Sequence, residues 1–316
     1  MKKILLVRWG GLGDLLVALP AIRLVRSGFP SAAITLVCRR EYGSLLLQAK
    51  TVDELVGQDD SRVLSLFSEA APAGDKRAAW LEGFDLVVTW LNQAKGGVPG
   101  ASGGGTEGGG RHLAICYDAR GREAISLFFF QKTREAVGWE KPPGADFQEC
   151  ARLPLSTMTD DPGLPFPRRP GRSRPLIVIH PGSGGEKKRW PLENFLEIAG
   201  RLRERNADGV FVTGEAEAAL DRRVEAAARS IGWLWLQSPA LGSLAKLLAD
   251  ADLYLGNDSG VTHLAAACGA RVLALFRNDL VDIWRPFGES HFLSADFVDL
   301  IGLECVWSAA AELLCN

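Results

Sequence analysis

The chain has 316 residues, of which 47% are hydrophobic and 23% charged, and its formal net charge is −2. This composition is typical of a globular protein long enough for two domains, and the charge gives no reason to expect nucleic-acid binding. No apolar run reaches the roughly 18 residues that a membrane span needs. The apolar run after Lys3 continues into Gly10 without a small-residue cleavage site, so we expect no signal peptide.

The cysteines are scattered along the chain without a C-x-x-C pair, which favours buried, reduced thiols over a metal or redox role. They are Cys38, Cys116, Cys150, Cys268, Cys305 and Cys315. Reduced thiols predict a cytoplasmic protein.

Short apolar runs alternate with segments of helical periodicity in the first half of the chain. We expect strands at residues 4–9, 33–38, 84–90 and 113–117, with helices that include residues 14–26 and 122–131. The strands are apolar throughout, as in a parallel sheet that is covered on both faces. The order predicts a doubly wound α/β domain over residues 1–155.

Two segments interrupt this pattern. Residues 94–110 are dominated by glycine and predict a mobile loop, and residues 156–174 are rich in proline and predict a linker. The alternation then restarts, with strands expected at residues 176–180, 210–213, 233–236, 253–256 and 272–276. Helices are expected at residues 191–205, 216–230, 243–251 and 261–268. Residues 175–316 therefore form a second doubly wound domain, and we expect a cleft between the two.

The first loop at a strand end is Gly10-Gly11-Leu12-Gly13-Asp14. A dinucleotide fingerprint fails here because Leu16 occupies the place of its third glycine, and the Walker lysine is absent. What remains is a flexible turn with Asp14 at the start of a helix. Asp14 is either a functional carboxylate or only the N-cap of that helix.

The second loop runs from His180 to Pro191 and contains Lys187, Lys188 and Arg189. Cations near a helix N-terminus are unfavourable for the helix, so the pattern favours a bound anion; the alternative is a solvated basic turn.

The third loop, Gly256 to His263, leaves the N–H groups of Ser259 and Gly260 accessible to a phosphate. His263 lies one turn further on the same helix face, as a ligand contact or as a hydrogen-bonded core residue.

At these residues the chain resembles glycosyltransferase family 9, which includes the ADP-heptose:lipopolysaccharide heptosyltransferases. The blocks that carry the resemblance are ILLVRWGGLGDLLVALPAIRLVRSGFPSAAITLV, HPGSGGEKKRWPLENF and YLGNDSGVTHLAAACGARVLALF. The resemblance implies the GT-B fold, which is two Rossmann-like domains facing a cleft. It also implies metal-independent transfer, with inversion, of a sugar from a nucleotide-sugar donor.

The resemblance also implies roles for individual residues. Asp14 matches the general base, and Lys188 matches the lysine that binds the donor diphosphate. The remaining donor-site matches are Ser183, Gly184, Asp258, Ser259, Gly260 and His263. Glu217 matches the acid that holds the ribose, although Glu215 is close enough to compete for that role.

The acceptor is expected on the first domain, where Gly11 and Gly13 make room beside Asp14. Arg120 is a candidate contact for an acidic acceptor, with a solvated surface arginine as the alternative. The expected reaction moves heptose from ADP-heptose to a lipopolysaccharide core or similar lipid-linked acceptor, with peripheral contact at the inner face of the inner membrane. The alternatives are a non-hydrolysing nucleotide-sugar epimerase and a nucleotide-sugar-binding protein without turnover.

Overall fold

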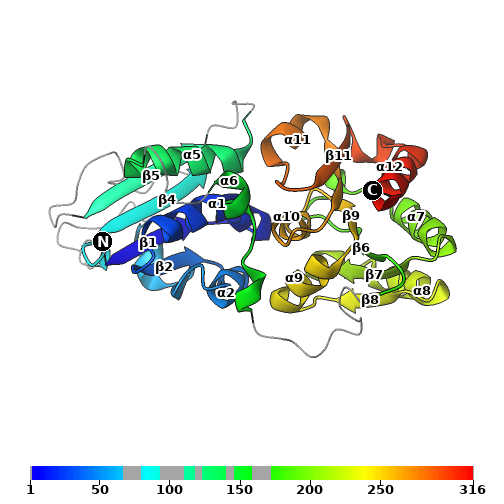
Figure 1. Ribbon diagram of the computed structural model, residues 1–316, viewed down its shortest axis with the longest axis horizontal. Coiled ribbons are helices and arrows are strands. Elements are labelled where there is room, and N and C mark those ends of the chain that lie inside the picture. The colour runs from blue at the N-terminus through cyan, green and yellow to red at the C-terminus, as the bar shows by residue number, and fades with distance from the viewer. Residues whose placement is uncertain are drawn as a thin grey trace. The chain divides into compact units, whose positions relative to one another are not determined.

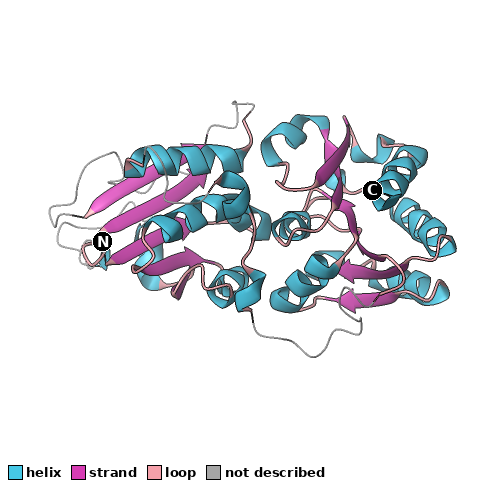
Figure 2. Ribbon diagram, viewed as in Figure 1, coloured by secondary structure: helices cyan, strands magenta, loops and turns pink. Residues whose placement is uncertain are grey.

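The computed structural model describes residues 2–66, 80–92, 110–117, 123–139, 146–158 and 172–315. The chain divides into two compact units, Met1–Met158 and Thr159–Asn316 (Figure 1). In each unit parallel strands alternate with helices (Figure 2). The predicted loop over residues 94–110 lies outside the described residues except for Gly110, as does most of the predicted linker.

The first unit has, in its described part, a five-stranded parallel sheet of order β3-β2-β1-β4-β5. The strands are β1 (Lys3–Arg8), β2 (Ala33–Cys38), β3 (Glu54–Gly57), β4 (Leu86–Asn92) and β5 (Arg111–Tyr117). The helices are α1 (Leu12–Gly28), α2 (Arg40–Gln48), α3 (Ser61–Leu66), α5 (Ile125–Val137) and α6 (Phe147–Ala151). Helices α1 and α5 lie side by side (Figure 1). The central strand β1 is buried at Ile4, Leu5 and Leu6, as its apolar run predicts.

The second unit has a parallel sheet of order β11-β10-β9-β6-β7-β8 over the described chain. Its strands are β6 (Leu176–His180), β7 (Asp208–Thr213), β8 (Leu234–Gln237), β9 (Leu253–Asn257), β10 (Val272–Arg277) and β11 (Ser290–Ala295). Its helices are α7 (Leu192–Glu204), α8 (Asp221–Ser230), α9 (Leu241–Asp250), α10 (Gly260–Ala267), α11 (Asn278–Trp284) and α12 (Leu303–Cys315). Helices α9 and α10 cover one face of the sheet, and α7, α8 and α12 cover the other (Figure 1).

Each sheet reverses its strand order next to its first strand, between β1 and β4 in the first unit and between β6 and β9 in the second. Ligands of open α/β sheets bind at such a switch point, beyond the carboxyl ends of the strands. All three loops singled out in the sequence begin at these points.

The structure corrects several predicted element bounds. The helix expected over residues 216–230 is a short 3-10 turn, Glu215–Glu217, followed by α8. Pro191 is the N-cap of α7 and not its first residue. Asp14 is the third residue of α1 and not its N-cap, which is Gly11, but its carboxylate still caps the helix start by accepting the Gly11 N–H. Helix α1 begins at Leu12, two residues before the expected start at residue 14, and Leu12 is an apolar residue buried in the core.

Candidate functional site

The loop after β6 is fixed at both ends by one buried side chain, Asn257 at the end of β9. Its Nδ2 donates to the carbonyl oxygens of Pro181 (2.8 Å) and Gly182 (3.3 Å). Its Oδ1 accepts the backbone N–H of Trp190 at 3.0 Å. Asn257 is fully buried, so these hydrogen bonds satisfy a side-chain amide that is shielded from solvent.

The middle of the same loop is open. A β-carbon built on Gly184 or Gly185 would meet nothing within 4 Å. By contrast, a β-carbon on Gly182 would fall 2.1 Å from the carboxyl carbon of Glu217. The loop therefore has a packed beginning and an unoccupied centre, which leaves backbone accessible to a ligand.

Lys188 and Asp258 join the loop after β6 to the loop after β9. The Lys188 Nζ donates to Asp258 Oδ2 at 2.7 Å, and the Ser183 hydroxyl donates to the Asp258 carbonyl oxygen at 2.7 Å. The Asp258 side chain is only 7% exposed, whereas that of Lys188 is 36% exposed. Because an ammonium has three donors, Lys188 retains hydrogen-bonding capacity for an anion on its exposed side.

Helix α10 begins beside this ion pair. Ser259 is its N-cap, and its Oγ accepts the Thr262 N–H at 3.3 Å. Gly260 is the first helical residue, and His263 is 6% exposed on the first turn. The N-terminus of a helix offers unpaired N–H groups and a partial positive charge, so an anion next to Lys188 would be stabilised by both.

Glu217 is buried on the 3-10 turn that follows β7, and its carboxylate is held by contacts within the protein. Its Oε2 accepts the Gly214 N–H at 3.0 Å and lies 3.7 Å from His180 Nε2, and its Oε1 lies 4.0 Å from Arg189 Nη2. Burial raises the pKa of Glu217, but His180, the Gly214 N–H and Arg189 together outweigh burial and leave the pKa below its usual value. Glu215, on the same turn, is exposed. The sequence favours Glu217 with Glu215 as a competitor, and in the structure Glu217 is buried while Glu215 is exposed.

In the first unit, Asp14 is held by contacts to both oxygens. Its Oδ2 accepts the Gly11 N–H at 2.9 Å, and its Oδ1 accepts Arg8 Nη2 at 3.1 Å. The side chain of Asp14 nevertheless remains 30% exposed. Gly10 has a φ of +124°, and a β-carbon there would lie 2.4 Å from Asp14 Oδ2. A glycine at position 10 is therefore required both by the backbone and by the carboxylate.

The acceptor-side candidates are described only in part. Gly11 and Gly13 are half-buried beside Asp14, at the beginning of α1. Arg120 lies outside the described residues. The sequence assigned no role to three further residues, which are the last residues of β1, β6 and β9: Arg8, His180 and Asn257.

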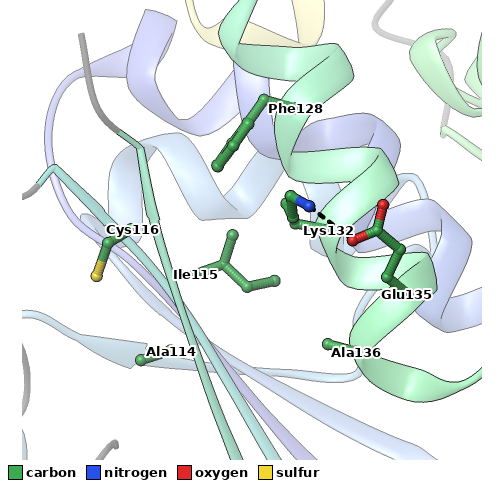
Figure 3. Close-up of a pocket in the computed structure, with 7 residues that line it drawn as sticks. All are labelled: Ala114, Ile115, Cys116, Phe128, Lys132, Glu135 and Ala136. Atoms are coloured by element: carbon green, nitrogen blue, oxygen red, sulfur yellow. Dashed lines mark hydrogen bonds and ion pairs between the residues drawn. The ribbon is translucent and has the colours of Figure 1, made fainter. Parts of the chain in front are cut away.

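A separate cavity of about 570 Å³ lies between β5 and α5 (Figure 3). Its lining is mostly apolar and consists of Ala114, Ile115, Cys116, Phe128, Lys132, Glu135 and Ala136. Lys132 and Glu135 pair with each other at 2.7 Å on α5, so neither charge lacks a partner there.

Among the residues that the structure describes, no group of three or more His, Cys, Asp or Glu side chains is placed to hold a metal ion. In the same part of the chain, no helix has both the length and the apolar character to cross a membrane. All six cysteines are free; Cys38, Cys150 and Cys268 are buried, while Cys305 and Cys315 are exposed.

Two doubly wound units in tandem, each with a singled-out loop at its switch point, define a two-domain α/β protein of the GT-B class. The profile of glycosyltransferase family 9 (heptosyltransferase) matches residues 122–295, more than half of the chain. The chain therefore belongs to glycosyltransferase family 9, a family of transferase enzymes.

Curated relatives agree with this assignment. Lipopolysaccharide heptosyltransferase 1 of Pseudomonas aeruginosa is 24% identical over 93% of the chain and 84% of the relative. The lipopolysaccharide core heptosyltransferase OpsX of Haemophilus influenzae is 27% identical over 33% of the chain. The chain matches 30% of the length of OpsX.

Solved structures share the fold. The E. coli heptosyltransferase WaaC with ADP aligns with a TM-score of 0.72 and 15% identity, over 98% of this chain and 99% of WaaC. A family 9 glycosyltransferase from Veillonella parvula aligns with a TM-score of 0.71 and 17% identity, over 99% of this chain and 97% of the other. These alignments confirm the predicted GT-B architecture.

Proposed function

We propose that the chain is an inverting heptosyltransferase that transfers heptose from ADP-heptose to a lipopolysaccharide-core or similar glycolipid acceptor. The observation that carries the donor assignment is the Lys188–Asp258 pair, which lies between the open Gly184–Gly185 segment and the first turn of α10. The Pseudomonas relative is a lipopolysaccharide heptosyltransferase, and WaaC was solved with ADP and with ADP-2-deoxy-2-fluoro heptose.

In the proposed reaction, an acceptor hydroxyl attacks the anomeric carbon of the donor sugar. Asp14 accepts the hydroxyl proton while the new carbon–oxygen bond forms. The bond from the anomeric carbon to the diphosphate breaks, its electron pair leaves with the diphosphate oxygen, and the configuration inverts.

Charge develops on the departing diphosphate, and Lys188 together with the N–H groups at the start of α10 stabilises it. We assign Ser183, Gly184, Ser259, Gly260 and His263 to the same donor site, and no step of the proposed reaction requires a metal.

For the ribose we retain Glu217 and Glu215 as the two candidates. Glu215 is exposed, so its carboxylate is accessible to a ribose. Glu217 is buried and already accepts the Gly214 N–H. The acceptor is proposed to bind at Gly11 and Gly13, with Arg120 as a contact to its acidic groups. Such an acceptor would bring the protein to a membrane surface as a peripheral enzyme.

The test measures ADP release from ADP-heptose with and without a heptose-free lipopolysaccharide core, and repeats it with UDP- and GDP-sugars. We expect turnover only with the ADP donor and the acceptor together. Conversion of a nucleotide sugar without any acceptor would instead favour the epimerase. Stabilisation by ADP without turnover on any acceptor would favour a binding protein.

Asp14→Asn tests the base within this scheme. Positioned general bases contribute about 10²–10⁴-fold to rate, so we expect kcat to fall by about that factor while ADP affinity remains unchanged. Turnover close to that of the wild type in a folded Asp14→Asn protein would remove Asp14 from the mechanism.

A further inference from the structure

Arg8, the last residue of β1, is a buried cation in contact with Asp14. Its side chain is 2% exposed. Its Nη2 donates to Asp14 Oδ1 at 3.1 Å, its Nε donates to the Asp14 carbonyl oxygen at 2.8 Å, and its Nη1 donates to the Trp90 carbonyl oxygen at 3.1 Å. The guanidinium also lies 5.0 Å from the ring centroid of Phe129.

These contacts place one planar group at the switch point of the first sheet. Arg8 belongs to β1, Trp90 to β4, Asp14 to α1 and Phe129 to α5. We propose that Arg8 is a positioning residue for catalysis, and that it holds the Asp14 carboxylate in a single orientation for proton transfer. The proposal rests on the assignment of Asp14 as the base.

The electrostatics make Asp14 the charge partner of Arg8. A buried cation is costly unless it is paired, and Asp14 is the carboxylate that Arg8 contacts. Burial lowers the pKa of Arg8, while the charge of Asp14 raises it. A guanidinium nevertheless stays protonated in proteins, so Asp14 faces a permanent positive charge.

The hydrogen bonding leaves Asp14 able to act. A carboxylate has about four acceptor positions, and Arg8 and Gly11 occupy one on each oxygen. The side chain is partly exposed, so the remaining positions can take a proton from a hydroxyl. A carboxylate held in this way loses little freedom when the substrate arrives, which is how positioning lowers a barrier.

Arginine suits this role better than lysine does. The three nitrogen atoms of the guanidinium reach three different oxygen atoms in one plane, whereas a lysine ammonium is a point charge that cannot reproduce this geometry. Lysine at position 8 would keep the charge and lose the orientation.

The test compares Arg8→Met, Arg8→Lys and a control, Arg26→Met. Arg26 is also on the first unit, bonds to the carbonyls of Thr51 and Ala32, and pairs with Asp53, but at the other end of α1. We expect Arg8→Met to lower kcat by about 100-fold, with the ADP dissociation constant within about twofold of the wild type. Arg8→Lys should recover part of the loss, and Arg26→Met should leave kcat nearly unchanged.

Equal losses of kcat in Arg8→Met and Arg26→Met would overturn the proposal, because they would mean that instability alone lowers the rate. Unchanged kcat in Arg8→Met and Arg8→Lys would overturn it as well. If Arg8→Met does not fold, the kcat of Arg8→Lys is compared with that of Arg26→Met, and equal values would overturn the proposal. The double variant Asp14→Asn/Arg8→Met should be no slower than Asp14→Asn, since the two residues act as one unit.

The Asp14→Asn measurement separates the base assignment from the positioning role. An active Asp14→Asn protein removes Asp14 from the mechanism, and the positioning role of Arg8 with it, while heptosyl transfer itself stands. An inactive Asp14→Asn protein combined with a fully active Arg8→Met protein contradicts only the positioning role of Arg8.

Discussion

Alanine substitutions at Gly182 and Gly184 would distinguish the packed beginning of the loop after β6 from its open centre. At Gly182 the new β-carbon would fall 2.1 Å from the carboxyl carbon of Glu217, and that carboxylate is fixed by the Gly214 N–H. Overpacking of this kind costs about 1–3 kcal/mol. A β-carbon built on Gly184 would have no atom within 4 Å, and the backbone of Gly184 lies outside the left-handed region. Alanine there should leave the free energy of unfolding unchanged or raise it by about 0.4–1 kcal/mol.

In contrast to stability, ligand affinity should suffer more from Gly184→Ala than from Gly182→Ala. If the diphosphate binds against the backbone of Gly184, the added methyl group collides with the ligand and weakens its affinity. ADP at 100 times its dissociation constant stabilises the wild type by about 2.7 kcal/mol. A tenfold weaker site at the same ADP concentration would give about 1.4 kcal/mol. In a domain of this size, 1 kcal/mol corresponds to roughly 2–4 °C in Tm.

The assay is thermal unfolding of the wild type and both variants, with and without ADP. We expect Gly182→Ala to have the lower Tm without ligand and Gly184→Ala to have the smaller rise in Tm with ADP. A Gly184→Ala protein with the full ADP-dependent rise would refute the placement of the diphosphate at the loop centre. An unperturbed Tm for Gly182→Ala would refute the packing argument.

Other predictions follow from single residues. Lys188→Met should weaken ADP binding by tenfold or more in calorimetry, because the cation that pairs with Asp258 beside α10 is lost; an unchanged dissociation constant contradicts this role. The folded-state pKa of Glu217 is lowered, so its charge stabilises the protein above the unfolded pKa, near 4.5, and this contribution is lost as pH falls through the folded pKa. The stability advantage of the wild type over Glu217→Gln, measured by denaturant titration, should therefore be present at pH 7 and shrink below about pH 4.5. A thiol reagent at pH 8 should modify Cys305 and Cys315 quickly and the three buried thiols slowly, as followed by mass spectrometry. Burial raises the pKa of all three buried thiols, to about 12 at Cys38, to about 11 at Cys150, and also at Cys268.

The sequence predicted the central strands well, because strands covered on both faces are apolar throughout. The run that predicted a strand at residues 4–9 is β1, and the run at residues 253–256 is β9. It did not predict β3 or β11. Strand β3 is four residues long and begins with an exposed glutamate, and β11 mixes exposed with half-buried residues, so neither has a continuous apolar run.

Candidate site residues could be selected from the sequence where the signal is local, and not where a contact depends on long-range pairing. Lys188, Ser183 and Ser259 stood out because small and basic residues precede helix starts. The contact of Arg8 with Trp90 spans 82 positions, and that of Asn257 with Pro181 spans 76. Only the order of strands in the sheet brings such residues together, and no local sequence pattern predicts that order.

The Asn257 clamp has a consequence for the entropy of ligand binding. Because one amide ties Pro181 and Gly182 to Trp190, the ends of the loop lose their freedom during folding and not during binding. Fixing the backbone of one residue costs roughly 1–2 kcal/mol, so a ligand that orders only the segment around Gly184 and Gly185 avoids most of this cost. A ligand that binds at the centre of this loop would therefore meet ends that folding has already fixed.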